Sequence, residues 1–342
     1  MLLNELIASH SAEITALEHE MVRETAVTPK ELLYARGPMR LYHYLPQTED
    51  VYRVPVLMIM SLVSKPYVFD LAPGQSLIEF LVRAGFDVYM ADWGTPRFEH
   101  RNVSFDDYVA EWLPDLIVQV QRYSGERDVS LLGYCLGGVL TTLYAALEPE
   151  GPLKNLLLLT TPVNGEGMEL MRQLARSLDV DQILESFGNV PASVVQAGFQ
   201  IQRPLQKAAG SFSVMNNVSD RDFIKSTLRL VRWGEEALPV AGETYRQLNR
   251  DIFIGNKIAR GEFELRGRKL SLGDIRVPVL HVLAEHDHVV PYASSRDLIR
   301  LVGSKDKEEW VIKGGHVSVV AGLGAVTRTW PRMVDWLAPR SV

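Results

Sequence analysis

The feature that most restricts the fold of this 342-residue chain is a cysteine flanked by glycines between an apolar strand and an apolar helix. Residues 131–138 read LLGYCLGG, which has the form G-x-C-x-G. Such a turn forces its central residue into a strained backbone conformation, and the glycines let the strand and the helix approach. Cys135 is therefore expected at a helix N-terminus, which stabilises an anion. The pattern predicts a nucleophilic thiolate. The alternative is a buried structural cysteine, because free cysteines are often buried.

Segments typical of strands alternate with helical segments on both sides of this turn. We expect strands at Met39–Tyr44 (an edge strand), Pro55–Ser61, Asp87–Ala91, Val129–Gly133, Leu153–Leu159, Pro278–Leu283 and Trp310–Ile312. We expect helices at Gln75–Ala84, Phe105–Tyr123, Leu136–Leu147, Tyr292–Val302 and Ala325–Leu337. The alternation predicts a mainly parallel sheet with helices on both faces. Together with the glycine-flanked turn, it predicts an α/β-hydrolase fold.

The alternation stops for ~100 residues, which is too long for a plain loop. This segment, residues 164–272, is helical and irregular in pattern, and we expect it to form a cap subdomain. The cap would cover the carboxyl edge of the sheet, where such folds bind ligands. Residues 27–163 and 273–342 would form the α/β core. Residues 1–26 have apolar side chains at helical spacing and predict an amphipathic helical arm, packed on the body or available to a partner.

Two late segments fit the remaining members of a catalytic triad, which runs nucleophile, acid, histidine in this fold. Asp287 follows a predicted strand, and His316 lies in a Gly-Gly-His sequence after the last strand. A histidine titrates close to neutral pH and can take a thiol proton, so His316 is the predicted general base. Asp287 either orients His316 or helps to deprotonate an incoming hydroxyl group. Glu285 is the competing carboxylate.

The oxyanion hole is expected to use two backbone N–H groups. One is that of Leu136, directly after the nucleophile, and the other is that of Val63 in the loop after an early strand. The Val63 loop can equally be a plain turn.

Three further histidines stand near Asp287 in the sequence. His281, His286 and His288 form a histidine-rich segment that could bind metal, but no second ligand cluster closes a site, so we expect no metal. His288 is instead predicted to contact the substrate. No cofactor is expected.

The overall composition excludes several classes of protein. The net charge of −6 argues against a nucleic-acid binder. The N-terminus lacks the pattern of a signal peptide, and no apolar stretch reaches the ~18 residues of a membrane span. The single cysteine cannot form an intramolecular disulfide, which fits a reducing compartment. A cytoplasmic protein is expected.

Taken together, the motifs resemble those of polyhydroxyalkanoate synthases of the short, two-subunit kind, from about Leu41 onward. The resemblance rests on LVSKPYVFDL at 62–71, DVYMADWG at 87–94, GYCLGG at 133–138, FGNVP at 187–191, AGETYRQLNRD at 241–251, AEHDHVVP at 284–291 and GGHVSVV at 314–320. FGNVP and GHVSVV look most like the Bacillus-type (class IV) synthase, which has a small separate partner subunit. The class III type, with a larger second subunit, is the runner-up.

This resemblance implies that Cys135, Asp287 and His316 form the triad. It also implies polymerisation of (R)-3-hydroxyacyl-CoA into polyester, a second synthase subunit, a homodimer, a mobile cap and association with cytoplasmic granules. A cysteine suits this reaction, because thioester exchange keeps the acyl group activated. The rival hypotheses are a cysteine hydrolase (a thioesterase or a dienelactone-hydrolase-like enzyme) and an inactive granule-bound scaffold.

Overall fold

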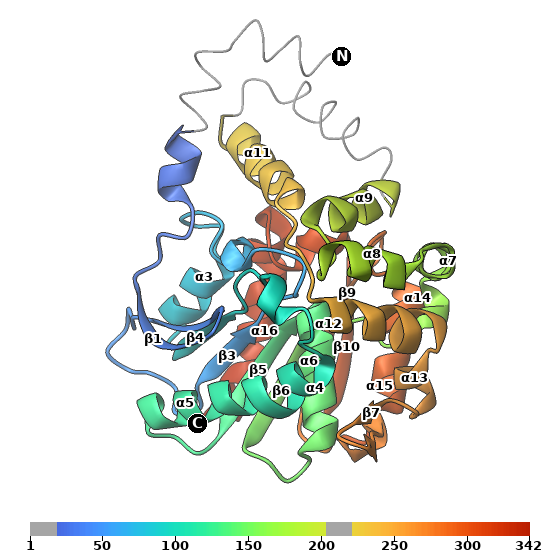
Figure 1. Cartoon of the computed structure of the whole chain (residues 1–342). Helices are drawn as coiled ribbons and strands as arrows, with labels where there is room; N and C mark the ends of the chain where they lie inside the picture. The colour runs from blue at the N-terminus through green and yellow to red at the C-terminus, as the bar shows by residue number, and fades with distance from the viewer. Residues whose placement is uncertain (1–18, 203–220) are drawn as a thin grey trace, which may run out of the picture.

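The computed structural model describes residues 19–202 and 221–342, which surround one twisted eight-stranded sheet (Figure 1). The strands lie in the order β1-β2-β4-β3-β5-β6-β9-β10. All neighbours from β4 to β10 are parallel, whereas β1–β2 and β2–β4 are antiparallel. The strands are β1 Lys30–Arg36, β2 Met39–Tyr44, β3 Val56–Ile59, β4 Val88–Asp92, β5 Val129–Tyr134, β6 Leu153–Leu159, β9 Val279–Ala284 and β10 Lys307–Ile312. The predicted fold class is therefore confirmed.

One strand of the eight-stranded sheet, β1, was not predicted, and one prediction is wrong as a result. Met39–Tyr44 was expected at the sheet edge, but it lies between β1 and β4. The true edge strand, β1, has the sequence KELLYAR, with its residues exposed or half-buried. Because an edge strand pairs on one side only and often carries charge, it lacks the continuous apolar run of a buried strand.

The helices of the α/β core lie on both faces of the sheet. Right-handed crossovers put α5, α6 and α15 on one face of the sheet and α3 on the other. The C-terminal helix α16 packs against α3 on that second face. The rings of Phe80 in α3 and Trp330 in α16 pack at a centroid distance of 5.6 Å. The core elements are α3 Leu77–Arg83, α4 Phe105–Asp107, the π-helix η3 Tyr108–Trp112, α5 Leu113–Ser124, α6 Leu136–Leu147, α14 Tyr292–Ser295, α15 Asp297–Leu301, the π-helix η8 Ala325–Thr329 and α16 Trp330–Leu337.

The chain between β6 and β9 is mainly helical, as its pattern predicts. Figure 1 shows α7, α8, α9 and α11 above the end of the sheet from which this segment leaves β6. Its elements are α7 Glu169–Ser177, α8 Val180–Phe187, α9 Ala192–Gln202, α11 Arg221–Glu235, α12 Gly242–Gln247, the π-helix η5 Leu248–Ile254, α13 Lys257–Arg260 and the hairpin of β7 Glu264–Leu265 with β8 Arg268–Lys269. The division into core and cap at residues 164 and 272 stays a prediction.

The predicted arm falls largely on residues 1–18, which lie outside the described residues. Residues 19–24 are helical, and they are joined to α11 by ion pairs. Lys225 Nζ lies 2.9 Å from Glu20 Oε1, and Glu24 pairs with Arg229. The Lys225 and Arg229 side chains are almost completely buried. These ion pairs join the chain before β1 to the inserted segment.

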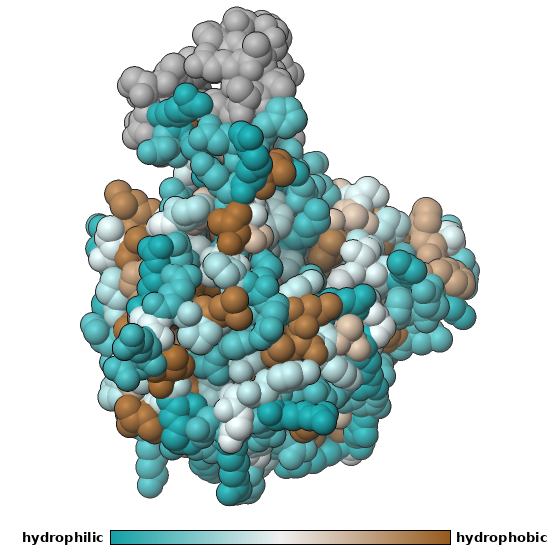
Figure 2. All heavy atoms as spheres, turned by 90° about the vertical axis from the view of Figure 1, so that its left-hand side faces the viewer, coloured by the Kyte–Doolittle hydropathy of each residue, from teal (hydrophilic) through white to brown (hydrophobic). Residues whose placement is uncertain are grey.

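The surface of the described residues is mixed. On the face seen in Figure 2, hydrophobic residues form separate patches among hydrophilic ones. Among the residues that the structure describes, no helix is both long and apolar enough to cross a bilayer.

Candidate active site

Cys135 stands at the predicted sharp turn between β5 and α6. Its backbone angles are φ 55° and ψ −121°, a conformation that side chains other than glycine rarely adopt. The Cys135 N–H still donates to Leu159 O of β6 at 2.9 Å, so the turn is fixed to the neighbouring strand. The side chain is 7% exposed. The structure thus has a strained cysteine at the N-terminus of a 12-residue helix.

The glycines around Cys135 allow close packing that no side chain would permit. A Cβ on Gly133 would lie 2.6 Å from the Cα of Gly138. A Cβ on Gly137 would overlap the carbonyl oxygen of Ile59 and would lie 2.7 Å from that of Met60. The start of α6 therefore packs directly on the end of β3, beside the loop that contains Val63.

His316 and Asp287, the predicted base and acid, lie side by side. His316 Nδ1 lies 2.7 Å from Asp287 Oδ2, and both side chains are buried. The other carboxylate oxygen, Oδ1, accepts hydrogen bonds of 2.8 Å from the N–H groups of Val289 and Val290. Because Nδ1 is bound to Asp287, the second ring nitrogen of His316 is the one left for Cys135, which contributes to the raised pKa of His316.

Tyr134 links the three segments of the site, and the sequence reading missed it. Its hydroxyl donates to His316 O at 3.3 Å, and the two rings pack at a centroid distance of 4.9 Å. The loops of the acid and the base are also joined, since the N–H of His286 donates to Gly314 O at 2.9 Å. An aromatic residue directly before the cysteine is the one sequence signal that could have indicated this contact.

The protonation of His316 reflects opposing effects. Burial lowers its pKa, but the negative charges of Asp287 and Cys135, with hydrogen bonds to both, outweigh burial and raise the pKa to about 9. At neutral pH, His316 is therefore protonated when it faces a thiolate. The arrangement can hold a thiolate–imidazolium pair out of solvent.

The two predicted oxyanion donors lie on neighbouring elements. Leu136 is the first residue of α6, where a backbone N–H has no acceptor four residues earlier in the helix. Val63 is 8% exposed, and its carbonyl accepts a hydrogen bond of 2.9 Å from the N–H of Leu238. That bond fixes the peptide that follows Val63.

The other acidic and histidine residues near Asp287 in the sequence are either exposed or buried in the sheet. The side chains of Glu285 and His286 are 52% and 68% exposed and lie 4.0 Å apart. His288 is exposed, and its contact with the substrate stays a prediction. His281 is fully buried on β9, and burial lowers its pKa to about 3, so it is a neutral structural residue. In residues 19–202 and 221–342, no group of three or more His, Cys, Asp or Glu side chains could hold a metal ion.

A strained cysteine between strand and helix, with a buried Asp–His pair on a parallel sheet, defines a protein of the α/β-hydrolase fold. Residues 66–322 match the α/β hydrolase fold family. The structure is similar to a monoacylglycerol lipase from Paleococcus ferrophilus, with a TM-score of 0.53 and 18% identity over 91% of this chain and 100% of that chain. At this identity, the likeness shows the fold alone.

Sequence relatives define the family more narrowly. Residues 3–81 match the N-terminus of poly-beta-hydroxybutyrate polymerase (PhaC). The chain is 34% identical to the poly(3-hydroxyalkanoate) polymerase subunit PhaC of Haloferax mediterranei, covering 94% of this chain and 66% of the relative, just under two thirds of its length. It is 31% identical to the same subunit of Allochromatium vinosum, covering 93% of this chain and 90% of the relative. The chain therefore belongs to the PhaC family of poly(3-hydroxyalkanoate) polymerases. The predicted resemblance to polyhydroxyalkanoate synthases is confirmed, as is the predicted kind of enzyme, a polymerase that transfers hydroxyacyl groups.

Proposed function

We propose that this chain polymerises (R)-3-hydroxyacyl-CoA thioesters into polyhydroxyalkanoate through a covalent thioester on Cys135. The substrate would be short, such as 3-hydroxybutyryl-CoA, and CoA would be released. One observation carries the proposal: in a chain of the PhaC family, a strained, buried cysteine raises the pKa of His316, whose Nδ1 lies 2.7 Å from Asp287.

Acylation begins with attack of the Cys135 thiolate on the thioester carbonyl carbon. The carbonyl oxygen becomes an oxyanion, which the N–H groups of Val63 and Leu136 stabilise. The bond from the carbonyl carbon to the CoA sulfur then breaks, and His316 gives its proton to the leaving thiolate. The raised pKa of His316 supports this role, because the imidazolium is already formed before CoA leaves.

Chain growth reverses the role of His316. The now neutral imidazole takes the proton of a hydroxyl group on a hydroxyacyl unit, and the oxygen attacks the Cys135 thioester. An ester bond forms, the bond to sulfur breaks, and the thiolate–imidazolium pair returns. The free energy of the CoA thioester is kept through the first step because one thioester replaces another. Helices α7, α8, α9 and α11 would exclude water, which would otherwise release the acyl group as acid.

Asp287 acts as the residue that orients His316. Its side chain is 1% exposed, and its two oxygens already accept hydrogen bonds from His316 and from two backbone N–H groups. A carboxylate held in this way has little room for direct contact with a substrate hydroxyl group. This supports the first of the two roles that the sequence left open for Asp287.

A second synthase subunit, a homodimer and attachment to polyester granules in the cytoplasm belong to the same proposal. The second subunit is supported by the names of the relatives, which describe PhaC as a subunit of the polymerase. The homodimer and the granules follow from the family resemblance alone.

Release of CoA tests the function. Purified chain, alone and with a candidate second subunit, is mixed with 3-hydroxybutyryl-CoA, and free thiol and insoluble polyester are measured. We expect both products from the wild-type chain and neither from Cys135→Ala. Release of CoA with only soluble 3-hydroxybutyrate would instead assign a thioesterase, and an inert Cys135 towards iodoacetamide would favour the scaffold. An unchanged rate in Cys135→Ala would exclude the covalent mechanism.

A further inference from the structure

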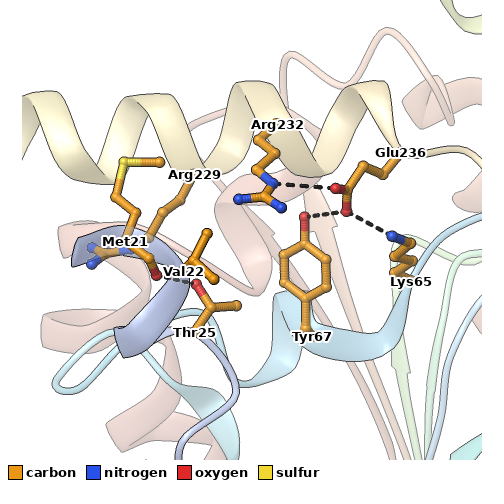
Figure 3. Close-up of a pocket in the computed structure, with 8 residues that line it drawn as sticks. All are labelled: Met21, Val22, Thr25, Lys65, Tyr67, Arg229, Arg232 and Glu236. Atoms are coloured by element: carbon orange, nitrogen blue, oxygen red, sulfur yellow. Dashed lines mark hydrogen bonds and ion pairs between the residues drawn. The ribbon is translucent and has the colours of Figure 1, made fainter. Parts of the chain in front are cut away.

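The loop that carries Val63 is held in place by residues at the end of α11 and directly after it. Residues 232–238 and residues 63–67 meet in a cluster of polar contacts, part of which is shown in Figure 3. Ser64 and Ala237 form an isolated antiparallel bridge. The Trp233 indole N–H donates to Lys65 O at 2.8 Å, and the indole is 7% exposed. Two backbone carbonyls of the loop, those of Val63 and Lys65, are thus fixed by residues after Arg232.

Glu236 adds a second layer of contacts at the same place. Its Oε2 accepts from Tyr67 Oη at 2.9 Å and from Lys65 Nζ at 3.0 Å, and Arg232 Nε donates to Oε1 at 3.2 Å (Figure 3). Burial raises the pKa of Glu236, but these three hydrogen bonds outweigh it and lower the pKa, so the carboxylate is charged at neutral pH. One carboxylate therefore ties α11 to both ends of the turn at Lys65–Tyr67.

These contacts matter because an oxyanion donor works only when it is aimed in advance. The Val63 N–H lies in the peptide plane that precedes Val63, and its direction changes when that plane turns. The orientation of this plane, and of the plane that follows Val63, depends on the contacts that hold the loop. On the side towards β3, Trp93 Nε1 donates to Met60 O at 3.0 Å. On the side away from β3, the loop is held by Trp233, Glu236 and Leu238.

We propose that Trp233 and Glu236 are positioning residues that set the direction of the Val63 N–H towards the developing oxyanion. This inference rests on the proposed function, in which Val63 is an oxyanion donor. It makes the placement of α11 a condition for fast acylation of Cys135: when α11 shifts, the Val63 donor shifts with it. The pair Cys135–His316 depends on other elements, β5 and β10, and is unaffected by such a shift.

Two reactions of Cys135 separate these effects. Acylation by p-nitrophenyl butyrate passes through an oxyanion, whereas alkylation by iodoacetamide needs the thiolate but forms no oxyanion. In Glu236→Ala, we expect single-turnover acylation to slow about tenfold, less than the ~10²–10³ that follows removal of a whole oxyanion donor. Alkylation should stay at the wild-type rate. Trp233→Phe, which removes the indole N–H and leaves a smaller aromatic ring, should show the same split to a smaller extent. Glu236→Gln should be intermediate because its amide oxygen still accepts.

The control is Glu185→Gln, an exposed glutamate of α8 that should leave both rates unchanged. Equal acylation in Glu236→Ala, Trp233→Phe and the wild-type chain would overturn the inference. A parallel loss of acylation and alkylation would also overturn it, because it would indicate a damaged site. The same holds if the wild-type chain is not acylated at all. Because p-nitrophenyl butyrate needs no polymerisation, a wild-type chain that is acylated normally but makes no polymer would contradict the proposed function and leave this inference standing.

Discussion

Asp287→Asn is the most selective perturbation that the site offers. The amide oxygen of Asn can still accept from the N–H groups of Val289 and Val290, so the loop should keep its shape. Its NH₂ group, however, would face His316 Nδ1, which now meets a carboxylate at 2.7 Å. The change removes the negative charge that does most to raise the pKa of His316 and favours the wrong tautomer of the ring.

The size of the effect follows from the raised pKa. One pKa unit corresponds to ~1.4 kcal/mol, so a rise from 6.5 to about 9 corresponds to about 3 kcal/mol in favour of imidazolium. Without Asp287, burial dominates and lowers the pKa of His316. The fraction of His316 that is protonated at pH 7 should fall, and kcat for CoA release should fall by ~10²-fold or more, as expected for a loss of about 3 kcal/mol.

The assay is the initial rate of CoA release together with the rate of alkylation of Cys135 at pH 7. Both should fall in Asp287→Asn. The matched control is Glu285→Gln, two residues earlier, because that carboxylate is 52% exposed and lies beside His286. Activity of Asp287→Asn within about tenfold of wild type would refute the reasoning, because the charge would then do less than its burial and distance imply. A large loss in Glu285→Gln would assign the acid to the wrong carboxylate.

Three further predictions concern stability. Gly137→Ala should lower the free energy of unfolding in urea by ~1–3 kcal/mol, because its Cβ would overlap Ile59 O. Gly198→Ala in α9 is the control: its Cβ would meet open space, so the change should be neutral or slightly stabilising. Equal stabilities of the two variants would contradict close packing at the turn around Cys135. The pKa of His316 is higher in the folded than in the unfolded state, so its contribution to the free energy of unfolding is complete below pH 6.5 and is lost as the pH rises through about 9. Over this pH range, the melting temperature should fall more in the wild-type chain than in Asp287→Asn. His281 is the opposite case, with a folded-state pKa of about 3, so wild type should lose up to ~1.4 kcal/mol per pH unit below 6.5, and His281→Gln should be less acid-sensitive by that amount.

The parts of the site that follow from local sequence were predictable. Strand, turn and helix around Cys135 are encoded in eight neighbouring residues, and the observed α6 begins and ends where the pattern predicts. The chain order of acid and histidine follows from the topology, which fixes Asp287 after β9 and His316 after β10. These inferences need only the period of apolar residues and the rules of parallel sheets.

What the sequence did not reveal depends on contacts between distant segments. The choice of Asp287 over Glu285, which follow the same strand, was made in the sequence, and in the structure Asp287 is the buried carboxylate beside His316. The hydrogen bond from Tyr134 to the carbonyl oxygen of His316 joins residues 182 positions apart. The contact of Glu236 with Lys65 spans 171 positions, and no periodicity along the chain indicates it. β1 was missed because its residues are exposed or half-buried.

The burial of Asp287 also restricts how one site can carry out two reactions. If Asp287 only orients His316, a single imidazole must first protonate the departing CoA sulfur and then take the proton of the attacking hydroxyl group. Both groups must therefore approach the same ring nitrogen, the one that faces Cys135, because Nδ1 is bound to Asp287. They cannot occupy that position together, so CoA has to leave before the hydroxyl group enters. Free CoA should then slow chain growth by competing with the hydroxyl group for this position, and a CoA analogue that lacks the thiol should compete less well.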